Sequence, residues 1–223
     1  MKILIIGVNG KMGKRVAEIC KKQNIDFAGV DIKEQSCKQQ FDAECANCSV
    51  AIDFSSPDAL EKNLEFCVKN KINIVVATTG HSDKNMQLIQ SAKKQIAIFV
   101  CPNLSVGFYR FILATQKLDC KNYDVAIIEQ HHKHKKDNPS GSAKQIQKTL
   151  DKNHTSIQTF GIRGGEEIGS HSVVFFGEYE KITITHQANS RDVFAQGAID
   201  VAKFLMPKRK GFFEMKDYFE NEK

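Results

Sequence analysis

The sequence contains no run of 18 apolar residues, so we expect no helix that spans a membrane and no membrane partner. It has no tryptophan, and it lacks a strong charge of either sign: 32 Lys and Arg against 26 Asp and Glu give a net charge of +6. This charge suits an anionic ligand but is too small to indicate a nucleic acid. With 41% hydrophobic and 26% charged residues in 223, the composition is typical of a globular protein with one large domain or two small ones.

The sequence also lacks a secretory signal, because an apolar strand at residues 2–6 begins the chain and runs into a glycine-rich loop. We therefore expect a cytoplasmic protein whose seven cysteines are free thiols. Cys45 and Cys48 form a single C-x-x-C, preceded by Cys37, but no second pair of ligands is nearby. We predict free thiols in a loop or short helix here, rather than zinc or redox chemistry, and no metal site.

Short apolar runs alternate with helical stripes over the first hundred residues. Strands are predicted at residues 2–6, 25–30, 50–54, 72–77 and 96–100. Helices are predicted up to about Lys22, from Ser56-Pro57 and from Ser82, where serine is a favoured N-cap. Residues 32–48 are polar and irregular and receive no assignment. This alternation predicts an α/β fold with a Rossmann-like, doubly wound parallel sheet.

The pattern changes after Asn103. A helix is predicted at 108–118, a strand at 125–129 and a helix that opens at Ser140, followed by three strands at 157–162, 172–176 and 181–186. Because no helices separate the last three strands, we expect a smaller α+β domain with a mixed or antiparallel sheet. Ser190 is expected to cap a final helix, and the tail from Pro207 is expected on the surface.

The turn after the first strand carries glycines at Gly7, Gly10 and Gly13. Such a turn places the free N–H groups of the following helix at the end of the strand, where they attract a pyrophosphate. The spacing G-x-x-G-x-x-G is not the common G-x-G-x-x-G, so this motif alone is weak. Asp31 strengthens it, because it lies 18 positions after Gly13 at the end of the second strand, where a carboxylate can hold ribose hydroxyls.

Asp31 also bears on the choice of nicotinamide dinucleotide. A carboxylate repels a 2′-phosphate, and Ile32 follows it rather than an arginine, so NADH is favoured. Lys11 and Lys33 could offset this repulsion, which leaves NADPH open.

Residues 129–143, EQHHKHKKDNPSGSA, form a basic cluster that leads into a helix. Six consecutive residues, 131–136, can carry positive charge, and we expect the N–H groups of Gly141 and Ser142 to point out of the helix start. A carboxylate could bind there, beside a histidine able to transfer a proton. Three alternatives compete: a solvated loop, a nucleic-acid patch, which the lack of aromatic residues disfavours, and a histidine metal site, which the lysines disfavour.

This cluster closely resembles the signature E-x-H-H-x-x-K-x-D-x-P-S-G-T-A of the 4-hydroxy-tetrahydrodipicolinate reductase family, with Ser142 in place of threonine. Further segments resemble the family's nucleotide loop and its motifs D-F-[ST], G-T-T-G, A-N-[FM]-S-[VL]-G and H-x-A-x-S-R. They lie at residues 7–13, 53–55, 77–80, 102–107 and 186–191, with Ala77 replacing the first glycine of G-T-T-G.

The resemblance implies roles for individual residues. His131 and Lys135 match the family's acid–base histidine and proton-donating lysine. The substrate dicarboxylate site is matched by His132, Lys135, Ser140, Gly141 and Ser142. The cofactor-binding stretches are matched by Gly7, Val8, Asn9, Gly10, Lys11, Met12, Asp31, Ala77, Thr78, Thr79, Cys101, Pro102, Asn103 and Leu104, with Arg191 and Phe194 near the final helix.

The resemblance also implies an architecture and a reaction. We expect a dinucleotide-binding domain at 1–104 and 190–223, a substrate-binding and oligomerisation domain at 105–189, and a homotetramer. The reaction is the reduction of (2S,4S)-4-hydroxy-2,3,4,5-tetrahydrodipicolinate to tetrahydrodipicolinate with loss of water, with NADH or NADPH, in lysine and diaminopimelate biosynthesis. Alternatives are another nicotinamide-dependent reductase of a small acid and a non-catalytic NAD(H) sensor. Only 22 positions separate Asp31 from Asp53, which is shorter than in many family members.

Overall fold

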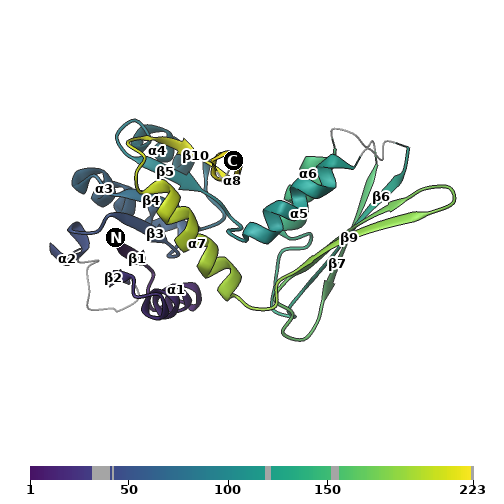
Figure 1. The fold of residues 1–223 in the computed structure, drawn as a ribbon, viewed down its shortest axis with the longest axis horizontal. Helices are drawn as coiled ribbons and strands as arrows, with labels where there is room; N and C mark the ends of the chain where they lie inside the picture. Colours follow the sequence, from purple (N-terminus) through teal and green to yellow (C-terminus); the bar gives the residue numbers. More distant parts are fainter. Residues whose placement is uncertain (32–40, 42, 119–121, 152–155, 222–223) are drawn as a thin grey trace. The chain divides into compact units, whose positions relative to one another are not determined.

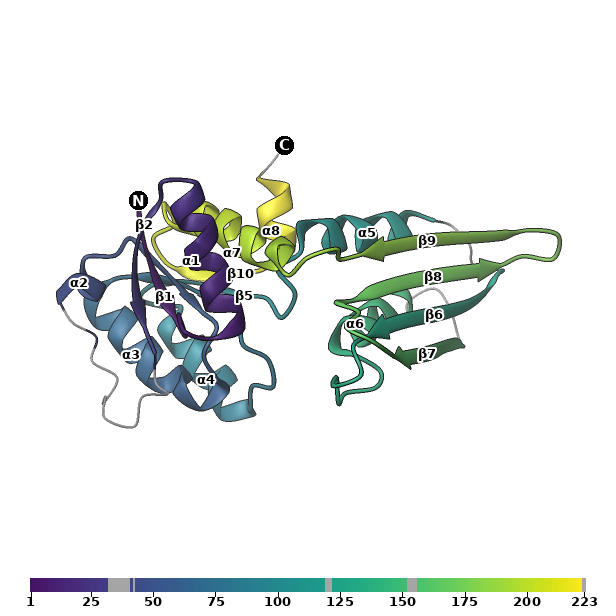
Figure 2. The ribbon, with the colours of Figure 1, turned by 90° about the horizontal axis from the view of Figure 1, so that it is seen from below.

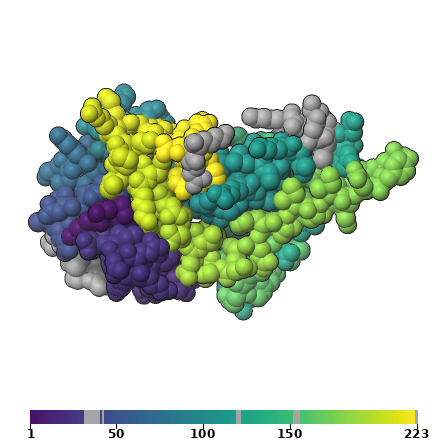
Figure 3. All heavy atoms as spheres, in the orientation of Figure 1, coloured from purple at the N-terminus to yellow at the C-terminus, as the bar shows by residue number. Residues whose placement is uncertain are grey.

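The computed structural model describes residues 1–31, 41, 43–118, 122–151 and 156–221. The chain divides into two compact units, one formed by residues 1–104 and 194–223 and the other by residues 105–193. Figure 3 shows the C-terminal segment, in yellow, against the purple and blue N-terminal segments, so both ends of the chain build the first unit. Ile32, Lys33 and Cys37 lie outside the described residues. None of the described helices combines the length and apolarity needed to cross a membrane.

The first unit contains a six-stranded parallel sheet in the order β10-β5-β4-β3-β1-β2. Its strands are β1 (Lys2–Ile6), β2 (Asp26–Val30), β3 (Val50–Asp53), β4 (Asn73–Val76), β5 (Ala97–Val100) and β10 (Gly211–Phe213). Every residue of β3 and β4 is buried, as expected for strands covered by helices on both faces. The predicted doubly wound sheet is confirmed.

Helices of the first unit connect and cover these strands (Figure 1). They are α1 (Lys11–Lys22), α2 (Ala43–Ala46), α3 (Leu60–Asn70) with the preceding 3₁₀ turn η1 (Pro57–Ala59), α4 (Asp83–Ala92), α7 (Asp192–Leu205) and α8 (Met215–Glu220). Ser82 caps α4, because its hydroxyl accepts the N–H of Asn85 at 3.3 Å. The predicted side-chain cap at Ser56 is wrong: a 3₁₀ turn begins there, and it is the Ser56 carbonyl that accepts the Ala59 N–H.

The C-terminal tail departs from the expectation of a surface segment. Strand β10 pairs in parallel with β5, and Met215 at the start of α8 is only 4% exposed. A three-residue strand carries no readable periodicity, and its place depends on β5, more than a hundred residues earlier in the chain.

The second unit contains a four-stranded sheet in the order β7-β6-β8-β9, which Figure 2 shows side by side. Its strands are β6 (Asp124–His131), β7 (Ile157–Arg163), β8 (Ser170–Phe176) and β9 (Lys181–Gln187). β7 is parallel to β6, whereas β8 is antiparallel to both β6 and β9, so the predicted mixed sheet is confirmed. Helices α5 (Val106–Lys117) and α6 (Gly141–Leu150) pack on one face (Figure 1).

The helix-covered face of this sheet has an apolar end and a polar end. At the apolar end, Ile127, Val173 and Phe175 pack with Phe108 of α5 and Ile146 of α6. Alternate residues along a strand share a face, so the side chains that continue this face toward the carboxyl end of β6 are polar. They are Glu129, His131, His171 and His186, and both helices begin beside them.

Candidate active site

Three neighbouring strands contribute a row of polar side chains to the candidate site. Glu129 of β6 is paired with His171 of β8, which is paired with His186 of β9. Paired residues point to the same side of a sheet, and His131, two residues after Glu129, shares that side. The rings of His131 and His171 lie 5.1 Å apart between centroids. The register of the sheet therefore gathers one carboxylate and three imidazoles.

Glu129 is fully buried and held by three donors from different segments. Arg163 Nη2 of β7 lies 2.7 Å from its Oε1, and the backbone N–H of Ser140 donates to the same oxygen at 3.2 Å. His131 Nδ1 contacts the other oxygen, Oε2. Burial acts to raise the pKa of the Glu129 carboxyl, but the bonds from Arg163 and His131 outweigh it and hold this pKa below its usual value. The buried carboxylate is therefore ionised.

His131 ends strand β6 and is 8% exposed. Burial lowers the pKa of its imidazole below the usual value, although Glu129 opposes this shift. A Cβ placed on Gly169 would lie 3.1 Å from His131 Nε2, so the absence of a side chain at residue 169 leaves space beside this nitrogen. His131 is thus anchored at Nδ1, and its Nε2 lies beside Gly169.

Two helices begin over the histidine row in the same way. Ser140 Oγ accepts the Ala143 N–H at 3.1 Å to cap α6, and it lies 3.5 Å from His171 Nε2. Ser105 Oγ caps α5 and lies 3.3 Å from His186 Nε2. Burial lowers the pKa of His171 to about 3, so its ring is neutral beside the positive end of the helix dipole.

Lys135 lies in the loop after β6 and forms an ion pair with Asp137, with 2.8 Å between Nζ and Oδ1. The other carboxylate oxygen of Asp137 accepts the N–H of Gly141 at 3.2 Å. Burial acts to raise the pKa of Asp137, but Lys135 outweighs it and keeps the pKa low. A carboxylate therefore binds to the two donors that the sequence assigned to an anionic ligand.

The remaining predicted substrate residues lie in the same loop and at the start of α6. His132 is half-buried, and its ring centroid is 6.2 Å from that of His134. Ser142 is half-buried in the first turn of α6. A Cβ on Gly141 would meet no atom within 4 Å, so there is open space for a ligand at the helix start. The second unit thus brings together all the predicted catalytic and substrate-binding residues.

The predicted nucleotide-binding residues of the first unit follow the carboxyl ends of parallel strands. Residues 7–12 follow β1, Asp31 follows β2, residues 77–79 follow β4 and residues 101–104 follow β5. Parallel strands present these ends at one edge of the sheet, where dinucleotides bind in folds of this type. Asp31 Oδ2 accepts the N–H of Asn9 at 2.9 Å, which ties this carboxylate to the glycine loop.

Glycines in the loop after β1 stand at positions where the backbone is packed too closely for a side chain. Gly7 has φ of +85°, and a Cβ there would lie 2.9 Å from the carbonyl oxygen of Phe54. A Cβ on Gly13 would lie 2.1 Å from the carbonyl oxygen of Gly7. These glycines therefore let the loop fold tightly at the start of α1, the place where a pyrophosphate binds in folds of this type.

Two further predicted residues lie on either side of the unit boundary. Arg191 belongs to the second unit and Phe194, in the first turn of α7, to the first. Cys101 is buried and donates its S–H to the carbonyl of Asn103 at 2.9 Å, and burial raises its pKa to about 12, so it remains a thiol. Cys45, within α2, and Cys48, two residues after that helix, are buried and form no disulfide in the described part of the chain.

Five residues of the site received no individual role from the sequence: Glu129, Asp137, Arg163, His171 and His186. Glu129, Asp137 and His186 stand at fixed positions of the family motifs, and the spacing of two between Glu129 and His131 also places both on one face of a strand. Arg163 and His171 reach them only through the register of β7 and β8.

Glu129, His131 and His171 each offer an atom within 4.8 Å of the others, a spacing that could hold a metal ion. The charges around them argue for a different use. Arg163 already neutralises Glu129, and Lys135 acts electrostatically on both histidines. We interpret the trio as part of a hydrogen-bonded ion-pair network.

Two family models and several relatives match nearly the whole length of this chain. The family model described as "Dihydrodipicolinate reductase, N-terminus" matches residues 1–104, and "Dihydrodipicolinate reductase, C-terminus" matches residues 107–219. A 4-hydroxy-tetrahydrodipicolinate reductase from Alkaliphilus oremlandii (strain OhILAs) is 34% identical, covering 97% of this chain and 98% of that protein. One from Caldanaerobacter subterraneus subsp. tengcongensis is 35% identical, covering 97% of each.

A solved structure supports the same fold. The dipicolinate-bound dihydrodipicolinate reductase from Paenisporosarcina sp. TG-14 superposes with a TM-score of 0.76 at 21% identity, over 96% of this chain and 97% of that one.

The buried histidines predict that stability falls in mild acid. Below its usual pKa of about 6.5, His171 takes up a proton in the unfolded chain but not in the folded one, down to about pH 3. The free energy of unfolding should therefore fall by about 1.4 kcal/mol per pH unit below 6.5 from this residue, with His131 and His186 acting in the same direction. Urea denaturation at pH 5, 6 and 7 checks this. His171→Gln should make the pH dependence shallower, and an unchanged slope would contradict the assignment.

Proposed function

The chain belongs to the dihydrodipicolinate reductase family, and on that premise we propose that it catalyses the NAD(P)H-dependent reduction of (2S,4S)-4-hydroxy-2,3,4,5-tetrahydrodipicolinate to tetrahydrodipicolinate in lysine biosynthesis. The observation that carries this proposal is the carboxylate already bound between Lys135 and the start of α6, in the loop that follows His131. An anion site next to a proton-transfer group suits a dicarboxylate that is reduced and protonated.

The reaction defines what the chain must supply. The substrate loses its 4-hydroxyl as water and gains one hydride and one proton in total. A bound nicotinamide dinucleotide supplies the hydride. The chain must neutralise two carboxylates, orient the ring and provide the proton.

We assign carboxylate binding to Lys135, His132 and the first N–H groups of α6. A substrate carboxylate would replace that of Asp137 at Lys135 Nζ and at the Gly141 N–H, since both groups already bind a carboxylate as donors. Ser142, in the first turn, adds a hydroxyl and a backbone donor. The dipole of the ten-residue helix α6 favours a negative charge at this end.

Proton supply is assigned to Lys135 or His131. Lys135 would release a charge-assisted bond to Asp137 when the substrate enters, which directs its ammonium toward the ligand. His131 presents Nε2 to the space beside Gly169. Both groups come from β6 and the loop after it, so one segment positions the two possible donors.

The cofactor is NADH or NADPH, with NADH favoured. Asp31 supports this preference, because its carboxylate lies at the end of β2 and is fixed to the glycine loop through the Asn9 N–H. At this place a carboxylate accepts ribose hydroxyls and repels a 2′-phosphate. We also propose the cytoplasm as the compartment, since the described cysteines are free thiols.

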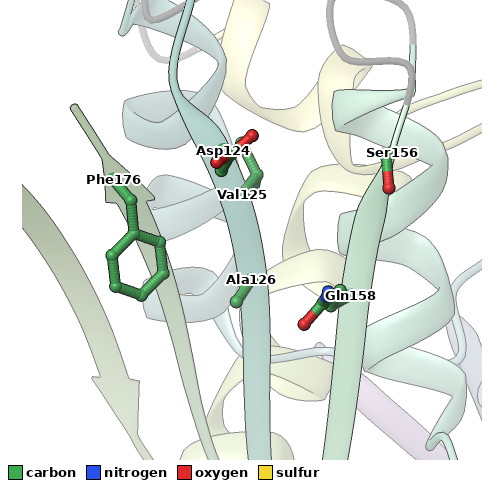
Figure 4. Close-up of a pocket in the computed structure, with 6 residues that line it drawn as sticks. All are labelled: Asp124, Val125, Ala126, Ser156, Gln158 and Phe176. Atoms are coloured by element: carbon green, nitrogen blue, oxygen red, sulfur yellow. The ribbon is translucent and has the colours of Figure 1, made fainter. Parts of the chain in front are cut away.

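A homotetramer is the proposed assembly, and the uncovered face of the second sheet is its proposed contact surface. Of the six large hydrophobic side chains exposed among the described residues, Phe160, Ile162 and Phe176 lie on this face and Tyr179 lies in its β8–β9 hairpin. A hollow of about 450 Å³ opens there between Phe176 and Gln158 (Figure 4). We propose these exposed hydrophobic side chains, which lie among polar residues of the same face, as a protein interface, with a second copy of the chain as the partner.

The assigned proton donors can be tested by NAD(P)H oxidation with a coupled supply of the substrate. Lys135→Ala and His131→Ala should each lower kcat by roughly 10² or more, the usual contribution of acid–base catalysis. Lys136→Ala, an exposed neighbour in the same basic run, should keep near-normal activity. Normal turnover in both test variants would contradict the assigned roles.

The preference for NADH predicts a second kinetic effect. Asp31→Asn removes the charge but keeps an oxygen that can accept the Asn9 N–H. The ratio of kcat/KM with NADPH to that with NADH should rise roughly tenfold, because a repulsion of about 1.4 kcal/mol is lost. An unchanged ratio would remove Asp31 from cofactor selection.

If the proposed homotetramer is held together by this face, one substitution on the face should reduce the mass of the protein in solution. Phe160→Asp places a charge on the exposed face and should dissociate the tetramer in light scattering coupled to size exclusion. Lys148→Asp, on the exposed side of α6, is the matched control and should leave the mass unchanged. A monomeric wild-type protein, or a Phe160→Asp protein of unchanged mass, would refute this surface.

A further inference from the structure

We propose that Glu129 is a positioning residue, which holds His131 through Nδ1 so that Nε2 is the nitrogen presented to the substrate. The inference rests on the proposed function for its catalytic meaning, because His131 needs a partner only if it moves a proton. It concerns a buried carboxylate for which the reaction itself has no direct use.

The direction of one hydrogen bond fixes the tautomer of His131. An ionised carboxylate only accepts hydrogen bonds, so the contact between Glu129 Oε2 and His131 Nδ1 requires a hydrogen on Nδ1. A neutral imidazole carries one hydrogen, so Nε2 then carries the lone pair, and this nitrogen supplies a proton to the substrate only after it has taken one up. Glu129 thereby selects the tautomer as well as the ring orientation.

The surroundings of Glu129 keep its carboxylate ionised and in place. Arg163 donates to Glu129 Oε1 at 2.7 Å and to the backbone carbonyls of Asp137 at 2.6 Å and Ile162 at 2.8 Å. Its guanidinium is therefore fixed by three acceptors. A Cβ on Gly161 would lie 2.7 Å from Glu129 Oε1, so the carboxylate can occupy this position only because residue 161 is glycine.

Glu129 also links His131 to the proposed anion site. Glu129 Oε1 also accepts the backbone N–H of Ser140, the residue that caps α6. One carboxylate therefore fixes both the proton-transfer ring and the start of the helix proposed to hold the substrate. Small movements between these two groups would misplace the proton relative to the ligand.

The charges around His131 determine the direction in which its titration should move when the charge of Glu129 is removed. Arg163 faces it from β7 and Lys135 from the following loop, while His171 of β8, next to His186 of β9, is its neutral neighbour. Glu129 is the negative group that acts on the ring. Without that charge, the remaining cations would push the titration of His131 to lower pH.

The test compares Glu129→Gln with Glu178→Gln, which makes the same change at the distant β8–β9 turn. Two-bond ¹H–¹⁵N spectra of histidine-labelled protein report the tautomer and titration of His131. The wild-type ring should carry its hydrogen on Nδ1. In Glu129→Gln the Nδ1-protonated form should lose its preference and the titration midpoint should fall by about one pH unit or more. Glu178→Gln should match the wild-type protein.

Kinetics provide the second readout. In Glu129→Gln, kcat should fall roughly 100-fold with a smaller change in KM, and the limb of the pH–rate profile that belongs to His131 should move to lower pH. Glu129→Asp, which restores the charge on a shorter side chain, should recover part of the midpoint shift. An unmoved tautomer and midpoint in a folded Glu129→Gln protein would overturn the proposal.

A variant that leaves Glu129 intact guards against a folding defect. Gly169→Ala places a methyl group 3.1 Å from His131 Nε2, so it should lower kcat while leaving the Nδ1 tautomer unchanged. A wild-type ring with its hydrogen on Nε2 would overturn the proposal without any variant. The spectra need no turnover, so a protein that fails to reduce the substrate would reject the proposed function while the test of Glu129 still gives its own answer.

Discussion

A negative charge buried without water must be neutralised by its neighbours, and Glu129 imposes this constraint on the second unit. Removing one partner of such a pair typically costs 3–5 kcal/mol. Glu129 meets the requirement with Arg163 of β7, His131 of its own strand and the Ser140 N–H at the start of α6. These segments are brought together around a single carboxylate, and they carry the residues of the candidate active site.

The helix-covered face of the second sheet has an apolar end and a polar end. This division explains how a buried polar cluster is stabilised in a small domain. Ile127, Val173 and Phe175 anchor the two helices through apolar packing. The same strands continue past the ends of the helices, so their next inward side chains meet helix N-termini rather than helix bodies. Apolar packing at one end of the face therefore holds both helices in place. At the other end their N-termini lie beside the polar site, where the dipole of α6 favours an anion.

Much of the fold could be predicted from local patterns. The short apolar runs before glycine and the serine cap of α4 predict their elements because those signals act over a few residues. The histidine-lysine cluster and the helix start at Ser140 predict an anion site for the same reason. The partners that arrive through strand register could not be predicted: Arg163 and His171 are more than thirty residues from Glu129 and meet it only once β7 and β8 are paired. Likewise, β10 has no pattern of its own and depends on the edge of β5.

The central claim is that Lys135 and the start of α6 bind a dicarboxylate, a place that the Asp137 carboxylate holds in this structure. Isothermal titration calorimetry with dipicolinate and with its monocarboxylate analogue picolinate, each in the presence of NADH, tests this most directly. The account predicts that dipicolinate binds at least tenfold more tightly and that its affinity falls with rising salt, because two charges are neutralised at the site. Equal affinities for the two acids, or no binding of either, would contradict it.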